Sequence, residues 1–363
     1  MKVLPRRDLD RIHPYQPGKP VEEVARELGI KGEIIKLASN ENPLGMSPKA
    51  REAAKRYLEE GYLYPDDQGF YLKEKLAKKH KVDPDMIILG NGSVDLIYLV
   101  CLAYLESNNN LIMTKGSFII AKIATYIAGA RLIEVPPRDD MTHNFEGILK
   151  SINKDTKLIF LDNPINPLGT ISTKEDFDEF MGEVPDNVLV ISDEAYYDYI
   201  TDADYIDSMR YLREGRNILI FHTFSKIYGM AGLRIGYGIA KPEIIQALMK
   251  VRLPFNTNRL GQIAALAALD DREHVKRSIE VNERGKEYLY KEFKRLGLFY
   301  LPTHANFIFV DFKRDAREVF EALQRQGVIT RPIPQYGFPT ALRITIGNEH
   351  QNQRLIEALE RVI

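Results

Sequence analysis

The residues with the clearest chemical potential surround one lysine in the second half of the chain. Lys226 follows the apolar run 218–221, which has the length and composition of a short buried strand. Hydroxyls precede it at Thr223 and Ser225, and Arg234 follows eight positions later. A lysine amine can form a Schiff base with an aldehyde, while hydroxyls and a guanidinium can hold a phosphate. Pyridoxal phosphate carries both groups, so this segment is a candidate site for it.

Polar side chains also follow the two preceding apolar runs. Asp162 comes directly after the run 158–161, and Asp193 comes soon after the run 188–191. The separations, about thirty residues each, fit one strand–helix–strand crossover between neighbouring sites. Because the carboxyl ends of parallel strands meet at one edge of a sheet, we expect the three sites to lie together.

These residues have possible roles around a pyridoxal ring. Asp193 could keep the pyridine nitrogen protonated, and Tyr196 and Asn166 could hydrogen-bond the phenolic oxygen. Taken singly, other interpretations are commoner: Asp193 as a helix cap or magnesium ligand, Asn166 as turn chemistry before Pro167, and Lys226 as a lysine that reaches water. Taken jointly, they favour the cofactor site.

Two further segments could contribute. Gly92 and Ser93 link a strand to a helix that starts near Val94, where backbone N–H groups can approach a phosphate, although this is also a common turn signal. Phe118 follows the next strand and could stack on a flat ring, or could equally be a core aromatic. The Gly-Tyr-Gly segment 236–238 is a fragment of a dinucleotide-binding pattern without its third glycine, and we discount it.

The surrounding pattern predicts an α/β fold. Between about residues 85 and 240, apolar runs of strand length alternate with helical patterns and lack the in–out alternation of a half-exposed sheet. We therefore expect a large domain with a mostly parallel, doubly wound sheet flanked by helices. The expected strands are 86–89, 111–113, 132–135, 158–161, 188–191 and 218–221, with helices at 94–105 and 174–181 among others.

Three parts are expected along the chain: an N-terminal arm at 1–32, a large cofactor-binding domain at 33–250, and a small C-terminal α+β domain at 251–363. A long helical stretch is expected from Gly261 to Tyr290. Beyond it we expect strands at 306–310, 327–330 and 342–346 and helices at 315–326 and 349–361.

Composition narrows the class of protein. The chain has 363 residues, of which 44% are hydrophobic, and its 50 basic side chains nearly balance 51 acidic ones. Without a basic stripe, nucleic acid and anionic membranes are poor candidate partners. The start lacks a secretory signal, and Cys101, the one cysteine, fits a small core residue better than a nucleophile, so we expect a cytoplasmic protein. The seven histidines lack metal-ligand spacing, so no metal site is expected.

The same segments resemble the fold-type-I, class I/II aminotransferases that depend on pyridoxal phosphate, and within them the histidinol-phosphate aminotransferases. The resemblance covers nearly the whole chain. The element formed by Lys226 and Arg234 marks the wider superfamily, whereas Tyr15, Arg331 and Arg343 point to the subfamily. The matching motifs lie at 13–15, 40–43, 64–66, 90–93, 166–167, 193–196, 225–226, 234, 305–307, 327–332 and 342–347.

The resemblance implies roles for individual residues. Lys226 would hold the cofactor and then carry the proton between substrate Cα and cofactor C4′, with Asp193 and Tyr196 as further catalytic residues. The cofactor would be bound by Lys226, Asp193, Tyr196, Asn166, Ser225, Thr223, Arg234, Gly92, Ser93, Phe118 and Tyr64. Tyr64 would reach the phosphate from the neighbouring subunit, so a homodimer would share its active sites.

The substrate would be bound, by the same resemblance, by Arg331, Arg343, Asn40 and Tyr15, the last contributed by the partner's arm. Two arginines also fit the chemistry independently, because guanidinium groups bind phosphate and carboxylate in bidentate fashion. The alternative for both arginines is surface ion pairing.

Some positions depart from the family's pattern. Ile165 and Leu168 replace the usual Asn and Thr, and Gly116 stands where proline is frequent. Ala121 replaces a common aromatic and Val94 a usual acidic residue. None removes a bonding group assigned above, but Ala121 and Val94 bear on the shape of the pocket.

The function implied is a transamination between L-histidinol phosphate and 2-oxoglutarate, giving imidazole-acetol phosphate and L-glutamate in histidine biosynthesis. Three alternatives remain open: an aromatic or broad-specificity amino-acid aminotransferase, a pyridoxal-phosphate-dependent phospho-amino-acid decarboxylase, and a cofactor-binding regulatory module without activity.

Overall fold

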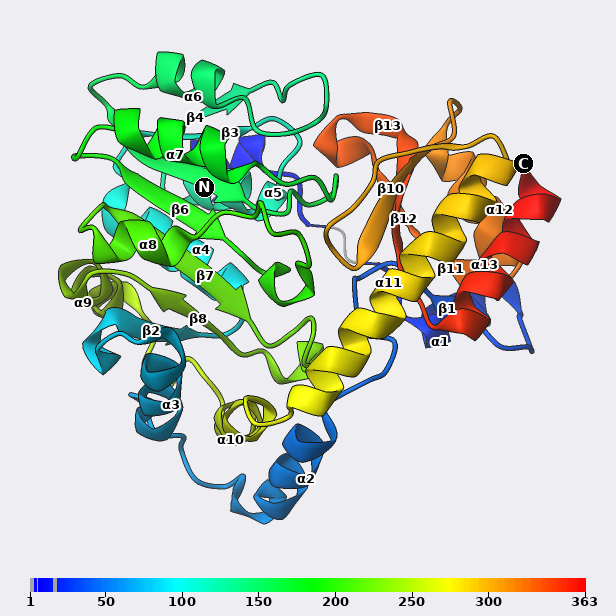
Figure 1. The fold of residues 1–363 in the computed structure, drawn as a ribbon, viewed down its shortest axis with the longest axis horizontal. Helices are drawn as coiled ribbons and strands as arrows, with labels where there is room; N and C mark the ends of the chain where they lie inside the picture. Colours follow the sequence, from blue (N-terminus) through cyan, green and yellow to red (C-terminus); the bar gives the residue numbers. More distant parts are fainter. Residues whose placement is uncertain (1–2, 5, 16–17) are drawn as a thin grey trace.

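The computed structural model describes residues 3–4, 6–15 and 18–363, so parts of the predicted arm, residues 1–2, 5 and 16–17, lie outside the described residues. Two sheets dominate the molecule, and the long helix α11 (Arg272–Arg295) runs from beside the large sheet across to the small one (Figure 1). Among the described residues, no helix combines the length and apolar character needed to cross a membrane.

The large sheet has seven strands in the order β2-β8-β7-β6-β5-β3-β4. All neighbours are parallel except β8, which runs antiparallel to both β2 and β7. The mostly parallel, doubly wound sheet predicted from the sequence is therefore confirmed. Its strands are β2 (Ile87–Gly90), β3 (Asn110–Thr114), β4 (Arg131–Val135), β5 (Thr156–Asp162), β6 (Leu189–Asp193), β7 (Ile218–Thr223) and β8 (Gly236–Ile239).

Strand β8 was not predicted. It contains the Gly-Tyr-Gly segment 236–238, and glycines are poor strand formers. Packing explains the glycine at position 236, because a Cβ on Gly236 would lie only 2.8 Å from the backbone nitrogen of Ser93. The glycine thus allows β8 to approach the turn before α4 closely.

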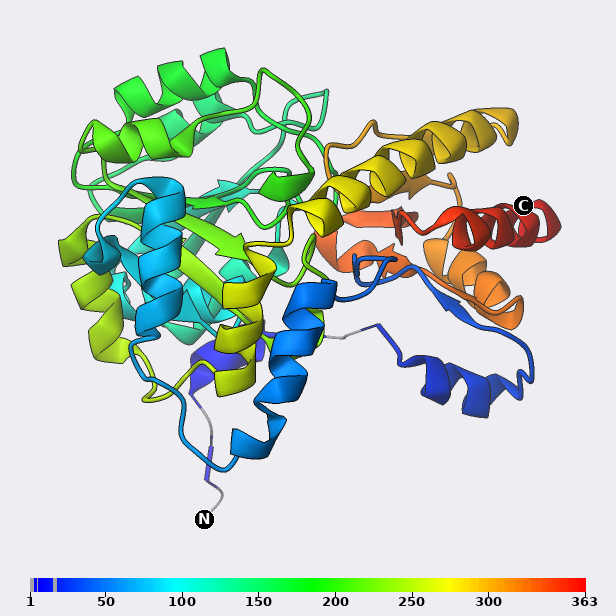
Figure 2. The same ribbon diagram turned by 60° about the horizontal axis from the view of Figure 1, so that its bottom comes forward.

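Helices cover both faces of the large sheet, as its strands, apolar on both faces, require. One face packs against α4 (Ser93–Tyr104), α5 (Ile119–Ile127) and α9 (Pro242–Val251). The other face packs against α3 (Phe70–His80), α6 (Phe145–Ser151), α7 (Lys174–Glu183), α8 (Ser208–Arg213) and α10 (Arg259–Ala268), and α2 (Pro48–Arg56) lies against α10 (Figure 2).

The small sheet has four strands in the order β12-β13-β10-β9, all antiparallel to their neighbours. They are β9 (Phe299–Tyr300), β10 (Phe307–Asp311), β12 (Arg331–Ile333) and β13 (Phe338–Thr345). Its core includes residues of α11, α12 (Ala316–Arg325) and α13 (Glu349–Val362).

A two-stranded parallel pair joins β1 (Ile35–Lys36) to β11 (Val328–Ile329). Residues 35–36, assigned to the large domain from sequence, thus pair with the C-terminal part of the chain. The limits at residues 32 and 250 stay predictions. The arm contributes α1 (Val21–Leu28) and the short 3-10 helix η1 (Arg7–Arg11), which lies against α5.

The helical stretch expected from Gly261 to Tyr290 is interrupted in the structure. Helix α10 ends at Ala268, and α11 begins at Arg272. The side chain of Asp271 accepts a hydrogen bond from the backbone N–H of His274 and caps α11. A continuous apolar periodicity concealed this break, because a cap is a local backbone event that leaves the apolar spacing unchanged.

Candidate active site

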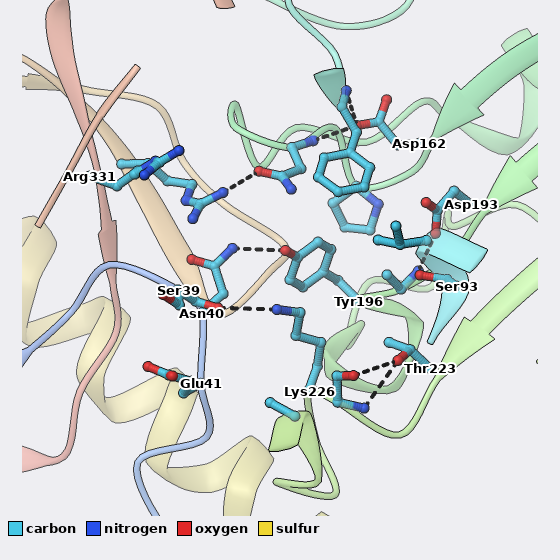
Figure 3. A pocket seen from close by; sticks show the side chains of 18 of the residues that line it. Ser39, Asn40, Glu41, Ser93, Asp162, Asp193, Tyr196, Thr223, Lys226 and Arg331 are labelled. Carbon is cyan, nitrogen blue, oxygen red and sulfur yellow. Dashed lines mark hydrogen bonds between the residues drawn. The ribbon is translucent and has the colours of Figure 1, made fainter. Parts of the chain in front are cut away.

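A cavity of about 250 Å³ opens at the carboxyl ends of β5, β6 and β7, facing the small sheet (Figure 3). The site residues predicted from sequence line it, except Gly92 and Tyr64. Those lining it are Tyr15, Asn40, Ser93, Phe118, Asn166, Asp193, Tyr196, Thr223, Ser225, Lys226, Arg234, Arg331 and Arg343. The structure thus brings together residues from both sheets, the segment after β1 and the arm.

Lys226 lies on the short segment after β7 and extends into the cavity. Its Nζ donates a hydrogen bond to the backbone oxygen of Ser39 at 3.2 Å and lies 5.6 Å from the centre of the Tyr196 ring. The side chain keeps partial exposure because it faces the cavity, but the surrounding protein desolvates the amine. Burial, with the nearby charge of Arg343, lowers the pKa of Lys226 to about 7. Near neutral pH, a large share of this amine is therefore uncharged and nucleophilic.

Asp193 ends strand β6 and is 3% exposed. One carboxyl oxygen accepts a hydrogen bond from the backbone N–H of Ala195 at 3.2 Å. Burial and the neighbouring carboxyl of Asp162 raise the pKa of Asp193 to about 8, and the charge of Lys226 lowers it only slightly. A cation placed against this carboxyl in the cavity would stabilise its charged form.

The side chains of Asn40 and Tyr196 both line the cavity and contact each other there. The Asn40 side-chain amide donates a hydrogen bond to the Tyr196 hydroxyl at 2.8 Å. Asn40 is held in turn by the small sheet, because its backbone N–H donates to the hydroxyl of Thr345 at 2.9 Å. Burial raises the pKa of Tyr196 to about 12, so the phenol keeps its proton at neutral pH.

Arg343 and Arg331 project from the neighbouring strands β13 and β12, where they are register partners. Arg343 donates to the side-chain oxygen of Asn166 and to the backbone oxygen of Ala38, each at 2.7 Å, while its Nε has no partner in the described part of the chain. Both arginines are more than 90% buried, which argues against the alternative of surface ion pairing.

Tyr15 lies over Arg331, with the guanidinium carbon 5.5 Å from the ring centre. The sequence resemblance placed a partner's Tyr15 at this position. In the structure, Tyr15 of the same chain lines the cavity, so a single chain supplies a tyrosine here.

Several hydrogen-bond donors lie close together at the N-terminus of α4, beside β7. Arg234 donates to the Ser225 hydroxyl at 3.3 Å and to the backbone oxygens of Ala231 and Asn91. Within the described ranges it forms no ion pair with a carboxylate. Thr223 lies in the same group, with its hydroxyl 3.0 Å from that of Ser225.

Gly92 shapes this group, although it is outside the cavity lining. Its φ is +79°, and a Cβ there would come within 2.4 Å of the Arg234 guanidinium. Glycine therefore allows the α4 N-terminus and Arg234 to meet, and Ser93, the first residue of α4, faces the cavity. N–H groups at a helix start together with a guanidinium form an anion-binding arrangement.

Tyr64 lies elsewhere on the surface of its own chain. It is 78% exposed and stacks on Phe255 with ring centres 4.7 Å apart. A contribution of Tyr64 to a phosphate site would require a second subunit, and this role stays a prediction.

Several residues of the site had no assigned role in the sequence analysis. Ser39 and Glu41 flank Asn40 and line the cavity, as do Pro164 and Asp162. Asp162 was identified as a polar residue at a strand end but was given no function. Ser39 acts through its backbone oxygen, a group that every residue type carries, so no side-chain pattern could have revealed it.

Comparisons with known proteins agree with this geometry. A family model described as aminotransferase class I and II matches residues 32–359. A histidinol-phosphate aminotransferase from Moorella thermoacetica is 48% identical over 97% of this chain and 91% of its own length. One from Caldicellulosiruptor saccharolyticus is 45% identical over 97% of this chain and 98% of its own.

Solved structures of aminotransferases share the fold of this chain. A histidinol-phosphate aminotransferase from Sinorhizobium meliloti, in complex with pyridoxal 5′-phosphate, superposes with a TM-score of 0.89 at 28% identity, covering 97% of both chains. An aspartate aminotransferase from Thermus thermophilus with maleate superposes with a TM-score of 0.85 at 22% identity over the full length of both chains, which shows the shared fold alone.

Proposed function

The chain belongs to the class I and II aminotransferase family, and we propose that it transfers the amino group of L-histidinol phosphate to 2-oxoglutarate. The products are imidazole-acetol phosphate and L-glutamate, a step of histidine biosynthesis. The observation that carries this proposal is the match to relatives named for this activity, 48% and 45% identical over 97% of the chain.

The enzyme depends on pyridoxal phosphate, and three features of the cavity fit this cofactor. Lys226 offers an amine of lowered pKa for the aldehyde. Asp193 is a buried carboxyl that a pyridinium nitrogen would stabilise in its charged form. Arg234 and the N-terminus of α4, brought together by Gly92, offer donors for the phosphate. Bound there, the cofactor supplies an aldehyde to take up the amino group and a ring to accept electrons from the Cα–H bond.

Lys226 has two tasks in this proposal. Its uncharged amine would bond the aldehyde carbon of the cofactor with loss of water, and the same amine, once freed by the amino group of the substrate, would take the proton from the substrate Cα. The Ser39 carbonyl, 3.2 Å from Nζ, offers the free amine a resting position within the cavity. A base of pKa about 7 suits a proton transfer that must run in both directions near neutral pH.

Tyr196 and Asn166 are proposed to hold the phenolic oxygen of the cofactor. Tyr196 keeps its proton and is oriented by Asn40, so it can donate into the cavity. The side-chain oxygen of Asn166 is occupied by Arg343, which leaves the amide NH₂ as the donor available to the cofactor. Phe118 is proposed to stack on the ring from the position where it lines the cavity.

Arg331 and Arg343 are proposed to bind the anionic end of each substrate in turn, with Tyr15 and Asn40 beside them. Donor and acceptor alternate in one pocket and carry a phosphate and a carboxylate respectively. Guanidinium groups bind both anions in bidentate fashion. Burial disfavours the charge of Arg331 and lowers its pKa, so an anion in the cavity would be bound strongly.

A homodimer with shared active sites forms part of the proposal. Large apolar side chains are exposed in two segments, 57–71 and 253–255, which the stacked rings of Tyr64 and Phe255 bring together: Tyr57, Leu58, Tyr62, Leu63, Tyr64, Phe70, Tyr71, Leu253 and Phe255. An exposed apolar patch of this kind marks an interaction surface. A second copy docked there would cover it and could carry Tyr64 to the phosphate end of the other cavity.

We also propose a cytoplasmic location. It rests on cysteine usage, because Cys101 is a buried free thiol and no disulfide framework is present in the sequence.

The decisive experiment compares amino donors. Purified enzyme is assayed with histidinol phosphate, phenylalanine and tyrosine, each with 2-oxoglutarate. A kcat/KM for histidinol phosphate well above the others supports the proposal, and equal values favour the broad-specificity alternative. Parallel double-reciprocal lines are expected from two half-reactions, whereas carbon dioxide release without a keto acid would indicate the decarboxylase.

A further inference from the structure

A single buried carboxylate ties together two parts of the cavity wall. Asp162 is the last residue of β5 and is 3% exposed. Its Oδ2 accepts hydrogen bonds from the backbone N–H of Phe118 at 3.0 Å and of Asn166 at 2.8 Å. Phe118 precedes α5, and Asn166 lies in the loop after β5, so one oxygen fixes two segments that are otherwise separate in the chain (Figure 3).

Asp162 also stands beside Asp193. The two are register partners on adjacent parallel strands, so their side chains point to the same face of the sheet. Both line the cavity, and the charge of Asp162 raises the pKa of Asp193. Two buried carboxyls at one strand edge are unfavourable by themselves, because like charges repel and burial penalises each.

The second oxygen of Asp162 is not engaged. Its Oδ1 is buried without a hydrogen-bond partner in the described part of the chain. The nearby Ser117 hydroxyl lowers the pKa of Asp162, although its Oγ makes no hydrogen bond of good geometry within the described part of the chain. Burial dominates and raises the pKa of Asp162 to about 7. The group is thus poised to gain its charge when a cation enters the cavity.

We propose that Asp162 is a positioning residue of the cofactor site, which fixes Phe118 and the Asn166 amide through Oδ2 and adds a second negative charge beside Asp193. This inference rests on the proposed function, because it assigns the role toward a ring bound between these residues. The carboxylate pair becomes favourable once a protonated ring nitrogen lies against Asp193, since both carboxylates then stabilise one cation.

Other charged and titratable groups surround Asp162 and Asp193 and also influence the pH dependence of the cofactor site. Glu194 raises the pKa of Asp193, and Lys226 lowers it. His143 contacts the Asp162 backbone oxygen through Nε2 at 3.1 Å, and burial lowers its pKa to about 4, so it stays neutral. Tyr196 keeps its proton, and Arg343 contacts Asn166.

The test compares two substitutions in the full-length enzyme loaded with pyridoxal phosphate. Asp162→Asn keeps an acceptor oxygen for the two N–H groups but removes the charge, whereas Asp162→Ala removes both. The measurements are the dissociation constant of the cofactor and the pH midpoint of its visible absorbance when bound. Asp271→Ala is the matched control, because Asp271 also accepts backbone N–H groups, from Lys49 and His274, but does not line the cavity.

We expect Asp162→Asn to bind the cofactor within about threefold of wild type and to shift the pH midpoint down by about half a unit or more, because a stabilising negative charge is lost. Asp162→Ala should show the same shift and bind at least about tenfold more weakly, the loss expected for released charge-assisted hydrogen bonds. Asp271→Ala should change neither quantity, whatever it does to thermal stability.

Unchanged midpoints in both Asp162 variants, or equal loss of cofactor affinity in Asp271→Ala, would overturn the proposal. If Asp162→Ala does not fold, the pH midpoint of Asp162→Asn and the cofactor affinity of Asp162→Ser decide whether the proposal holds. Failure of the proposed function is distinguishable, because wild-type enzyme would then show no cofactor absorbance or no turnover of histidinol phosphate.

Discussion

Arg343 donates a hydrogen bond to the side-chain oxygen of Asn166 at 2.7 Å, which joins the small sheet to the loop after β5. The side-chain oxygen of Asn166, a residue that lines the cavity, is thereby bound to a proposed substrate-binding residue. The amide of Asn166 is thus shared between the proposed substrate-binding and cofactor-binding groups. An anion that displaced Arg343 from this hydrogen bond would therefore also change the contact between Asn166 and the cofactor.

Replacing Lys226 by alanine should remove both turnover and the visible absorbance of the bound cofactor. A general base alone contributes about 10²- to 10⁴-fold, and here the covalent attachment is lost as well. Steady-state assay and an absorbance spectrum of the purified variant check this. Lys122→Ala, which disturbs only a surface ion pair with Glu134, serves as the control. A Lys226→Ala enzyme that keeps both signals would contradict the mechanism.

The rate at which pyridoxal phosphate adds to cofactor-free enzyme should fall about tenfold per pH unit below pH 7. The reason is the lowered pKa of Lys226, about 7, since only the uncharged amine attacks an aldehyde. Stopped-flow absorbance between about pH 5 and about pH 9 measures this rate. A rate that keeps rising about tenfold per pH unit up to about pH 9 would show an amine of ordinary pKa.

The contribution of Asp193 to the stability of the cofactor-free protein, taken as the difference between wild type and Asp193→Asn, should fall as pH rises from about 4 to about 8. The buried His80 and His143, whose pKa is lowered to about 4, act in the opposite direction and cancel in this difference. The folded pKa of Asp193 is raised to about 8, so in this window the folded state holds a proton that the unfolded chain has released. Each such proton contributes a slope of about 1.4 kcal/mol per pH unit. Asp162 and Glu194, each with a pKa raised to about 7, add to the slope of both proteins below pH 7. Denaturant unfolding of wild type and Asp193→Asn at several pH values measures this difference, and a difference that does not change with pH would contradict the raised pKa of Asp193.

Replacing Arg331 or Arg343 by alanine should lower kcat/KM for histidinol phosphate and for 2-oxoglutarate by about 10- to 150-fold, the loss of one hydrogen-bonded charge partner. Lysine at either position should recover only part, because it lacks the planar fork. Arg314→Ala, which removes a surface contact to the backbone of Val362, is the matched control. An effect on only one of the two substrates would separate the roles of the two arginines.

Mixing two defective variants should test whether Tyr64 acts across subunits. Tyr64→Ala should bind the cofactor weakly, and Lys226→Ala should be inactive. In a hybrid dimer, the Tyr64→Ala chain keeps its own Lys226 and receives Tyr64 from the partner, so one intact site forms. Refolding the two together at limiting cofactor should restore about a quarter of wild-type activity, given random pairing and one site per hybrid. No recovery, in a mixture shown by sedimentation to be dimeric, would place Tyr64 in its own chain's site, whereas full activity of Tyr64→Ala by itself would place it in none.

The sequence by itself determined the sheet and the strand ends that line the cavity. Apolar runs buried on both faces predict parallel strands, and the spacing of Asp162, Asp193 and Lys226 predicts that their carboxyl ends share an edge, because the crossover connection has one favoured hand. The family resemblance added residues far from these strands in the sequence, such as Tyr15 and Arg331, which line the same cavity.

Only the tertiary structure decided contacts that act through the backbone or across long separations. No side-chain pattern reveals that the Ser39 carbonyl receives Lys226, or that one oxygen of Asp162 holds both Phe118 and Asn166. The pKa values of Lys226 and Asp193 depend likewise on desolvation, which exists only once both sheets enclose the cavity. Spacing along a chain encodes local periodicity, whereas burial and through-space charge are properties of the assembled molecule.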